Sequence, residues 1–142
     1  MKKLLMTACA ALATIVPTVA QATYTTPDTE MRSAWIATVY RLDWPCEVIS
    51  TTGSTSQINR QKRDLTRMLD SMAVNNMNAA KLQIRSRCDA LYMSSYEPWS
   101  SEIVSRRGMD PGYDPFEFFV QECHSRSRYG THSGARAGCV HC

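Results

Sequence analysis

Residues 32–40 read RSAWIATVY, and this stretch decides the fold class. It is rich in β-branched and aromatic side chains, and it carries no charge after Arg32. An apolar run of this length is typical of a strand that is buried on both faces, as the strands of parallel sheets are. We therefore expect residues 32–40 to form a strand of a parallel sheet.

The next segments change from strand to helix and back. Ser56 is placed to cap a helix in which apolar residues recur at helical spacing with charged residues between them, and Asn75 and Asn76 are placed to end this helix. A second strand is expected over 79–85. A second helix opens at Asp114, because an aspartate cap is followed by proline and glutamate in the first turn. The residues expected to face the core are Ile58, Leu65, Met68, Leu69 and Met72 on the first helix and Phe116, Phe119, Val120 and Cys123 on the second.

The order strand, helix, strand, helix predicts parallel βα units. Both strand-to-helix connections are long, over about 41–55 and 86–113, whereas the helix-to-strand turn is short. Loops longer than about 12 to 15 residues in compact domains are usually functional or disordered. In α/β folds, function gathers at the carboxyl ends of the strands. We therefore expect the functional site in these two connections.

The first 22 residues have the features of a secretory signal. Lys2 and Lys3 precede an apolar run over 4–16, and small residues lead to Ala22, after which we expect cleavage. The alternative is a membrane anchor, but the run is shorter than the roughly 20 apolar residues that span a bilayer. We expect export to the periplasm, the cell envelope or the outside, with no membrane contact after cleavage. Residues 23–29 are expected to be a linker.

Composition excludes several classes of protein. The formal net charge is +3, and loss of the two signal lysines leaves +1, which argues against a nucleic-acid partner. Five of the six cysteines remain after cleavage, and an odd, irregularly spaced set is a poor disulfide framework, so we expect mostly isolated thiols. The Cys-x-x-Cys at 139–142 leaves a zinc or redox site as an alternative, but the surrounding segment offers no apolar scaffold for ligands. We expect no metal and no other cofactor.

Asp43 and Trp44 directly follow the first strand. A carboxylate beside an exposed indole suits a sugar site, because one accepts hydroxyl hydrogen bonds and the other covers an apolar patch of the ring. The alternative is that Trp44 plugs the end of the sheet while Asp43 caps a turn. Both interpretations remain open from the sequence.

A polar row follows the second strand. Alternation places Gln83, Arg85 and Arg87 on one side, and Asp89 and Trp99 come next along the chain. Such a row needs either a ligand or internal partners, for example an ion pair between Arg85 and Asp89.

Glycoside hydrolysis generally needs two carboxyl groups that flank the scissile bond. Asp43, Asp89, Glu97 and Asp110 are each possible, and no spacing rule selects among them. Asp110, followed by proline and glycine, is better explained as turn chemistry. The catalytic residues therefore stay unknown at this stage.

Several unusual strings occur in a fixed order along the chain: EMRSAWIATV (30–39), LDWP (42–45), QIR (83–85), DALY (89–92), SYEPWS (95–100) and DPGYDP (110–115). Taken together, they resemble the opening of the glycosyl-hydrolase-like 10 family. That resemblance implies an exported bacterial protein with a (β/α) barrel and glycosidase activity, and it implies that Asp43, Trp44, Arg85, Asp89 and Trp99 lie at the barrel mouth and bind a glycan substrate.

The resemblance covers 30–126, and the remaining 127–142 are expected to be an irregular, disordered tail. A closed barrel takes about 250 residues, so the expected fold is a partial (β/α)8 TIM-type barrel made of the first two βα units. A frameshift near Arg126 and a genuine short paralogue are the two explanations considered for the tail. The expected function is that of a truncated glycoside hydrolase for a polysaccharide or envelope glycan, inactive alone because the acid and base come from later strands. The alternative is a small exported carbohydrate-binding or envelope interaction module.

Overall fold

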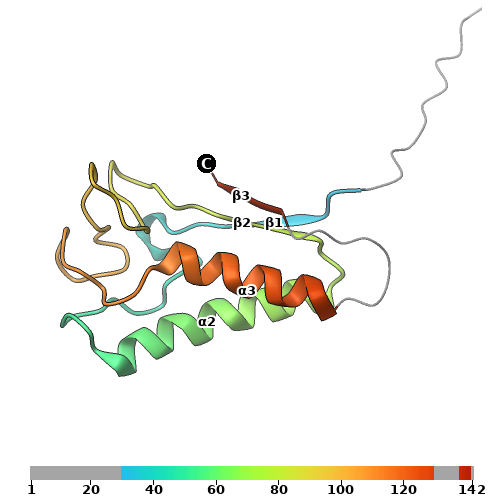
Figure 1. Ribbon diagram of the computed structural model, residues 1–142, viewed down its shortest axis with the longest axis horizontal. Helices are drawn as coiled ribbons and strands as arrows, with labels where there is room; N and C mark the ends of the chain where they lie inside the picture. The colour runs from blue at the N-terminus through green and yellow to red at the C-terminus, as the bar shows by residue number, and fades with distance from the viewer. Residues whose placement is uncertain (1–29, 130–137, 142) are drawn as a thin grey trace, which may run out of the picture.

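The computed structural model describes residues 30–129 and 138–141. Three parallel strands form one sheet in the order β1-β2-β3, and helices α2 and α3 both cover the same face of it (Figure 1). The predicted signal sequence and linker, 1–29, lie outside the described residues. The elements are β1 (Ser33–Ile36), the 3-10 turn η1 (Val39–Arg41), α2 (Thr55–Val74), β2 (Ala79–Leu82), α3 (Pro115–Tyr129) and β3 (Gly138–His141).

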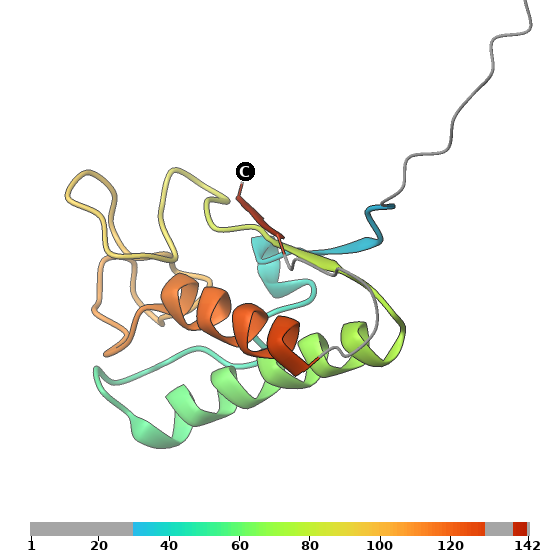
Figure 2. The same ribbon diagram turned by 45° about the vertical axis from the view of Figure 1, so that its right-hand side comes forward.

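The order of βα units confirms the prediction of a parallel α/β fold. Strands β1 and β2 pair in register, with Ser33 opposite Ala79 and Ile36 opposite Leu82. In the turned view of Figure 2, both helices again lie on one side of the sheet, and the long connections again gather at the carboxyl ends of the strands.

Strand β1 is shorter than the predicted 32–40, and side chains explain why. After Ile36, Ala37 N donates to Oδ2 of Asp43 at 2.7 Å, so this backbone group makes no ladder bond. The next two backbone N–H groups both donate to Oε1 of Gln83 at 3.0 Å. The strand ends at Ile36 although the apolar run continues, because the side chains of Asp43 and Gln83 accept the backbone N–H groups that a neighbouring strand would otherwise bind.

Helix α2 begins earlier than expected and ends where expected. Its N-cap is Ser54, not Ser56, and the cap makes no side-chain hydrogen bond. Asn75 caps the carboxyl end, and Asn76 takes the left-handed conformation with φ 56° that commonly ends helices. Asp114 caps α3 as predicted, because its Oδ1 accepts Glu117 N at 2.9 Å.

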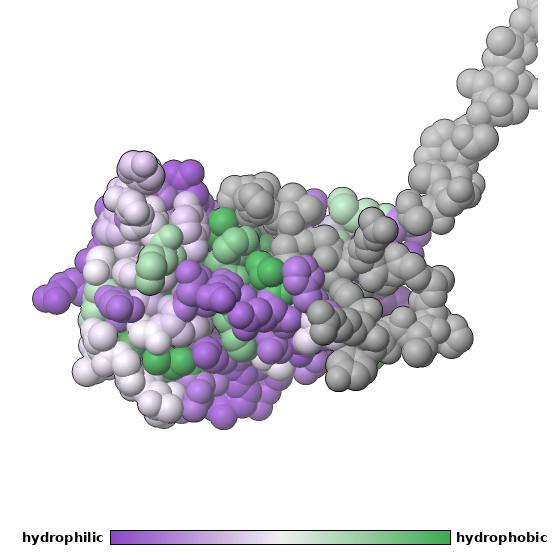
Figure 3. All heavy atoms as spheres, viewed as in Figure 1, coloured by the Kyte–Doolittle hydropathy of each residue, from purple (hydrophilic) through white to green (hydrophobic). Residues whose placement is uncertain are grey.

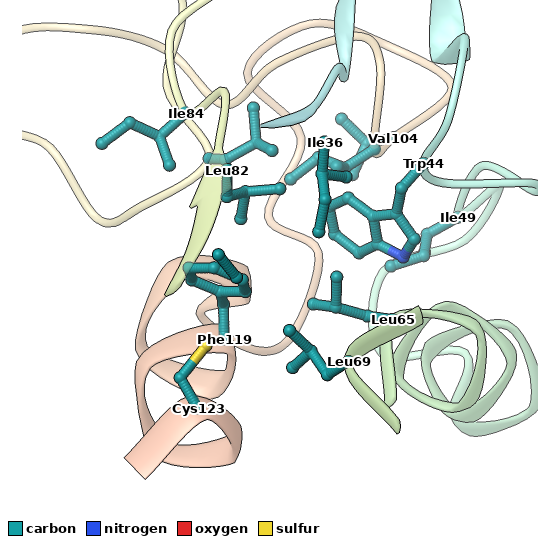
Figure 4. Close-up of a cluster of buried hydrophobic side chains, with 13 residues drawn as sticks. Ile36, Trp44, Ile49, Leu65, Leu69, Leu82, Ile84, Val104, Phe119 and Cys123 are labelled. Atoms are coloured by element: carbon teal, nitrogen blue, oxygen red, sulfur yellow. The ribbon is translucent and has the colours of Figure 1, made fainter. Parts of the chain in front are cut away.

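The core lies between the sheet and the two helices (Figure 4). Leu65 and Leu69 from α2 and Phe119 and Cys123 from α3 are buried there, which confirms the predicted stripes. The other predicted helix residues are half-buried against this core. Trp44 is also fully buried, so the first long connection contributes a core side chain.

The prediction of an irregular tail over 127–142 is wrong in two places. Helix α3 continues through Tyr129, and Gly138–His141 forms β3, which pairs with β2. An open strand edge presents unpaired backbone groups, and a short segment can pair with them whatever its side-chain pattern. That is why a segment without apolar periodicity joins the sheet. Residues 130–137 lie outside the described part of the chain.

Hydrophilic side chains cover much of the outward face of the helices, whereas the end formed by the connections is mostly near neutral in hydropathy (Figure 3). Among the described residues, we find no helix with the length and apolar character that a membrane crossing requires.

Candidate functional site

The two long connections meet at the carboxyl ends of the strands. A parallel bridge joins Ile49 to Val104, and Ile49 N donates to the carbonyl oxygen of Ile103 at 2.9 Å. The first connection is therefore fixed to the second, and both form the surface in which the sequence analysis placed the site (Figure 1).

Gln61 on α2 holds this junction together from beneath. The side chain is fully buried, and its Nε2 donates to the carbonyl oxygens of Glu47 at 2.7 Å and of Ile103 at 2.9 Å. Its Oε1 accepts the hydroxyl of Tyr113 at 2.8 Å. One amide thus orders both connections, a role that the sequence analysis missed because Gln61 reads as an ordinary polar helix residue.

Asp43 and Trp44 follow the alternative interpretation. Trp44 is buried beside Ile36 and Leu65 (Figure 4), and its Nε1 donates to the carbonyl oxygen of Gln61 at 2.9 Å. Its indole is covered by protein, so the prediction that Trp44 lines a glycan cleft is wrong. Asp43 is exposed, but its carboxylate caps the end of β1 through Ala37 N.

Asp89 is also a structural residue. It is 1% exposed, and its carboxylate accepts Ser100 Oγ at 2.8 Å and Arg87 N at 3.2 Å. The suggested ion pair between Arg85 and Asp89 is not formed. Neutral donors satisfy this buried carboxylate instead, which leaves it no exposed surface for substrate.

Arg85 lies at the surface and pairs with Glu97. The hydrogen bond to Glu97, together with the charge of that carboxylate, raises the pKa of Arg85. About half of the Arg85 side chain is exposed, so its guanidinium is accessible at the carboxyl end of β2. Trp99 is half-buried against the core, and its backbone forms a parallel bridge with Ala90.

The next arginine of the polar row forms a second pair, which was not predicted as a site. Arg87 pairs with Glu102, which is only 3% exposed. The Arg87 guanidinium also lies over the ring of Tyr40, with its carbon 5.2 Å from the ring centroid. The arginine was noted in the polar row, but no sequence rule connects it to a glutamate fifteen positions later or to a tyrosine after β1.

Across 30–129 and 138–141, no group of three or more His, Cys, Asp or Glu side chains is arranged to hold a metal ion. The side chains of the Cys-x-x-Cys at 139–142 are outside the described part of the chain. Cys46 and Cys88 are exposed and form no disulfide.

Comparison with known proteins decides the family. The model of the family described as "Glycosyl hydrolase-like 10" matches residues 30–129. The chain belongs to the glycosyl hydrolase-like 10 family. The matched part contains β1, both long connections and both helices, and hence every side chain described at the carboxyl ends of the strands.

Two curated relatives agree with the family assignment. The chain is 40% identical over 100 residues to "Glycosyl hydrolase YngK" of Bacillus subtilis, a match covering 70% of this chain and 18% of the relative. It is 35% identical over 97 residues to "Glycosyl hydrolase DigH" of Escherichia coli strain K12, covering 68% of this chain and 22% of that relative. The chain thus matches about one fifth of the length of each relative.

Proposed function

We propose that this chain forms the opening βα units of a glycosidase-type (β/α) barrel and that its carboxyl-end connections bind a polysaccharide or envelope glycan. The observation that carries the proposal is the family match over 30–129 together with exposed polar groups at the carboxyl ends of β1 and β2. Barrel enzymes place their substrate sites at this end of the strands.

The sheet supports the barrel part of the proposal. Ile36 and Leu82 face the helices, so their neighbours Trp35 and Lys81, which are register partners, point to the opposite face. Trp35 is 46% exposed there. In a closed barrel this face lines the interior, where such side chains pack in layers.

The carboxylates support a binding role without turnover for this chain alone. Asp43 caps β1, Asp89 is buried among neutral donors, and Glu97 pairs with Arg85. Asp110 accepts Gly112 N at 2.7 Å, which is the turn role expected for it. Each carboxylate nominated for acid or base catalysis thus already has a structural partner, whereas glycoside hydrolysis needs two such groups beside the bond.

Export is part of the proposal and rests on the signal-like residues 1–22. N-terminal sequencing of protein recovered from the periplasm or the medium of a bacterial host should begin at Thr23. A protein that stays in the cytoplasm with Met1 intact would contradict this part.

Retention on insoluble glycans tests the binding proposal. The purified chain is incubated with cellulose, chitin and bacterial envelope glycan, and both retained protein and released reducing ends are measured. We expect retention on at least one glycan without release of reducing ends. No retention on any of them would reject glycan binding. If reducing ends are released and one carboxylate substitution abolishes the release, the chain does hydrolyse glycan, and the proposal of binding without turnover is rejected.

A matched pair of arginine variants refines the experiment. Arg85→Ala removes a guanidinium at the proposed surface, whereas Arg63→Ala removes an exposed one from α2. We expect weaker retention only for the first. Equal weakening would indicate general electrostatic attraction to the glycan preparation.

A further inference from the structure

The Tyr40 ring stands out among the exposed side chains of this end. It is 71% exposed, lies in η1 four residues after the end of β1, and has φ 53°, while Arg41 has φ 55°. A left-handed conformation costs an ordinary residue roughly 1–2 kcal/mol, and two in succession are uncommon.

One face of this ring is supported by protein. The guanidinium of Arg87 lies over it, 5.2 Å from the centroid, within the range of a cation–π contact. Since most of Tyr40 is exposed, the opposite face of the ring is open to solvent.

The supporting arginine is itself held in place. Its Nη2 donates to Glu102, which is buried, and to Ser101 Oγ at 3.3 Å. Its carbonyl oxygen accepts Arg107 Nη2 at 3.2 Å. The base of Tyr40 is fixed as well, because Gln83 accepts the backbone N–H group of Val39 directly before it. The ring and its support are therefore ordered before any ligand arrives.

We infer that the Tyr40 ring, backed by Arg87, is a stacking platform for an uncharged pyranose ring of the glycan. This inference rests on the proposed function and names a residue and a ligand class for it. The open ring face covers the apolar C–H face of a sugar, as aromatic side chains at sugar sites do.

The charge beneath the ring bears on the ligand class. Glu102 pairs with Arg87, so the guanidinium that supports the ring brings no net charge of its own. Arg87 lies on the supported face of the ring, and an acidic sugar stacked on the open face would therefore gain no ion pair from this support.

Binding of defined tetrasaccharides to the full chain tests the platform. Dissociation constants are measured by calorimetry for cellotetraose, chitotetraose and tetragalacturonate. We expect a neutral tetrasaccharide to bind more tightly than tetragalacturonate. Its dissociation constant should rise about fivefold for Tyr40→Ala, but less than about twofold for Tyr40→Phe, which keeps the ring.

Two further variants keep the result interpretable. Tyr40→Gly removes the ring but suits a positive φ, so it should fold and bind as weakly as Tyr40→Ala. Tyr96→Ala is the matched control, because Tyr96 is 97% exposed and no ring or cation contact is found for it within the described residues. It should bind like the unaltered protein.

The outcomes separate the two proposals. If the unaltered chain binds a tetrasaccharide while Tyr40→Ala and Tyr40→Gly bind equally well, the platform is rejected and the glycan proposal stands. A larger loss for Tyr96→Ala also rejects the platform, and preference for tetragalacturonate rejects the uncharged ligand class. If no tetrasaccharide binds to the unaltered chain, both proposals are rejected.

Discussion

Replacing Gln61 by methionine tests how the two long connections are held. Methionine fills nearly the same volume but cannot form the three side-chain hydrogen bonds to Glu47, Ile103 and Tyr113. Leaving each buried partner unsatisfied costs roughly 1 kcal/mol or more, so we expect Gln61→Met to lower the free energy of unfolding by about 3 kcal/mol.

That loss is large for a domain of this size. Domains are stable by about 5–15 kcal/mol, and 1 kcal/mol shifts the melting temperature of a 60–100-residue domain by about 4–8 °C. Urea unfolding followed by circular dichroism gives the free energy, and a thermal scan should show a midpoint lowered by at least about 12 °C.

Gln121→Met provides the matched control. Gln121 is exposed on α3, and its amide donates to Glu117 Oε1 at 3.1 Å, so its loss should change the free energy of unfolding by less than about 0.5 kcal/mol. A loss below about 1 kcal/mol for Gln61→Met, or an equal loss for the control, would refute the reasoning.

Three smaller experiments address other polar groups. Burial raises the pKa of Tyr113, so this hydroxyl ionises in the unfolded chain before it ionises in the folded one as pH rises above about 10. The stability that the neutral hydroxyl contributes below that pH is then lost. Tyr113→Phe should reduce this decline of the free energy of unfolding, measured by urea unfolding between about pH 8 and 11. The hydrogen bond to Asp64 raises the pKa of the Cys46 thiol, so Asp64→Ala should speed its alkylation by iodoacetamide at pH 8, measured by peptide mass spectrometry; an unchanged rate would contradict this. Asp89→Ala leaves buried donors without an acceptor and should lower the thermal midpoint by an amount equivalent to about 2 kcal/mol, whereas an unchanged midpoint would refute its structural role.

The sequence predicted the elements that depend on local patterns. Leu65 and Leu69 on α2, and Phe119 and Cys123 on α3, are each four residues apart and buried, and Asp114 caps its helix with local chemistry alone. These features follow from neighbours along the chain, which is why periodicity and capping rules reach them.

Features that depend on distant partners were not reached. The end of β1 is set by Gln83, a residue about 45 positions away from the N–H groups it accepts. The destination of Trp44 was equally open, because a tryptophan after a strand can either fill the core or remain at the surface. Gln61 decides it here, since its backbone oxygen accepts the indole N–H inside the core.

The arginines of the polar row differ in a way that only their partners explain. Both Arg85 and Arg87 are about half exposed, and each pairs with a glutamate. The Glu97 side chain is 17% exposed, so water and salt weaken that pair, and surface pairs contribute little to stability. The Glu102 side chain is 4% exposed, and Arg87 compensates its buried charge.

Two similar substitutions should therefore differ in their effect on stability. Arg87→Ala leaves Glu102 as an uncompensated buried carboxylate and should lower the free energy of unfolding by about 3 kcal/mol. Because that cost requires Glu102 to be charged, the double variant Arg87→Ala with Glu102→Gln should regain part of the loss. Arg85→Ala should leave the melting temperature unchanged, since Glu97 can turn toward water. If both single variants melt at the same temperature, burial of Glu102 does not distinguish the two pairs, and the ordered support beneath Tyr40 loses its physical basis.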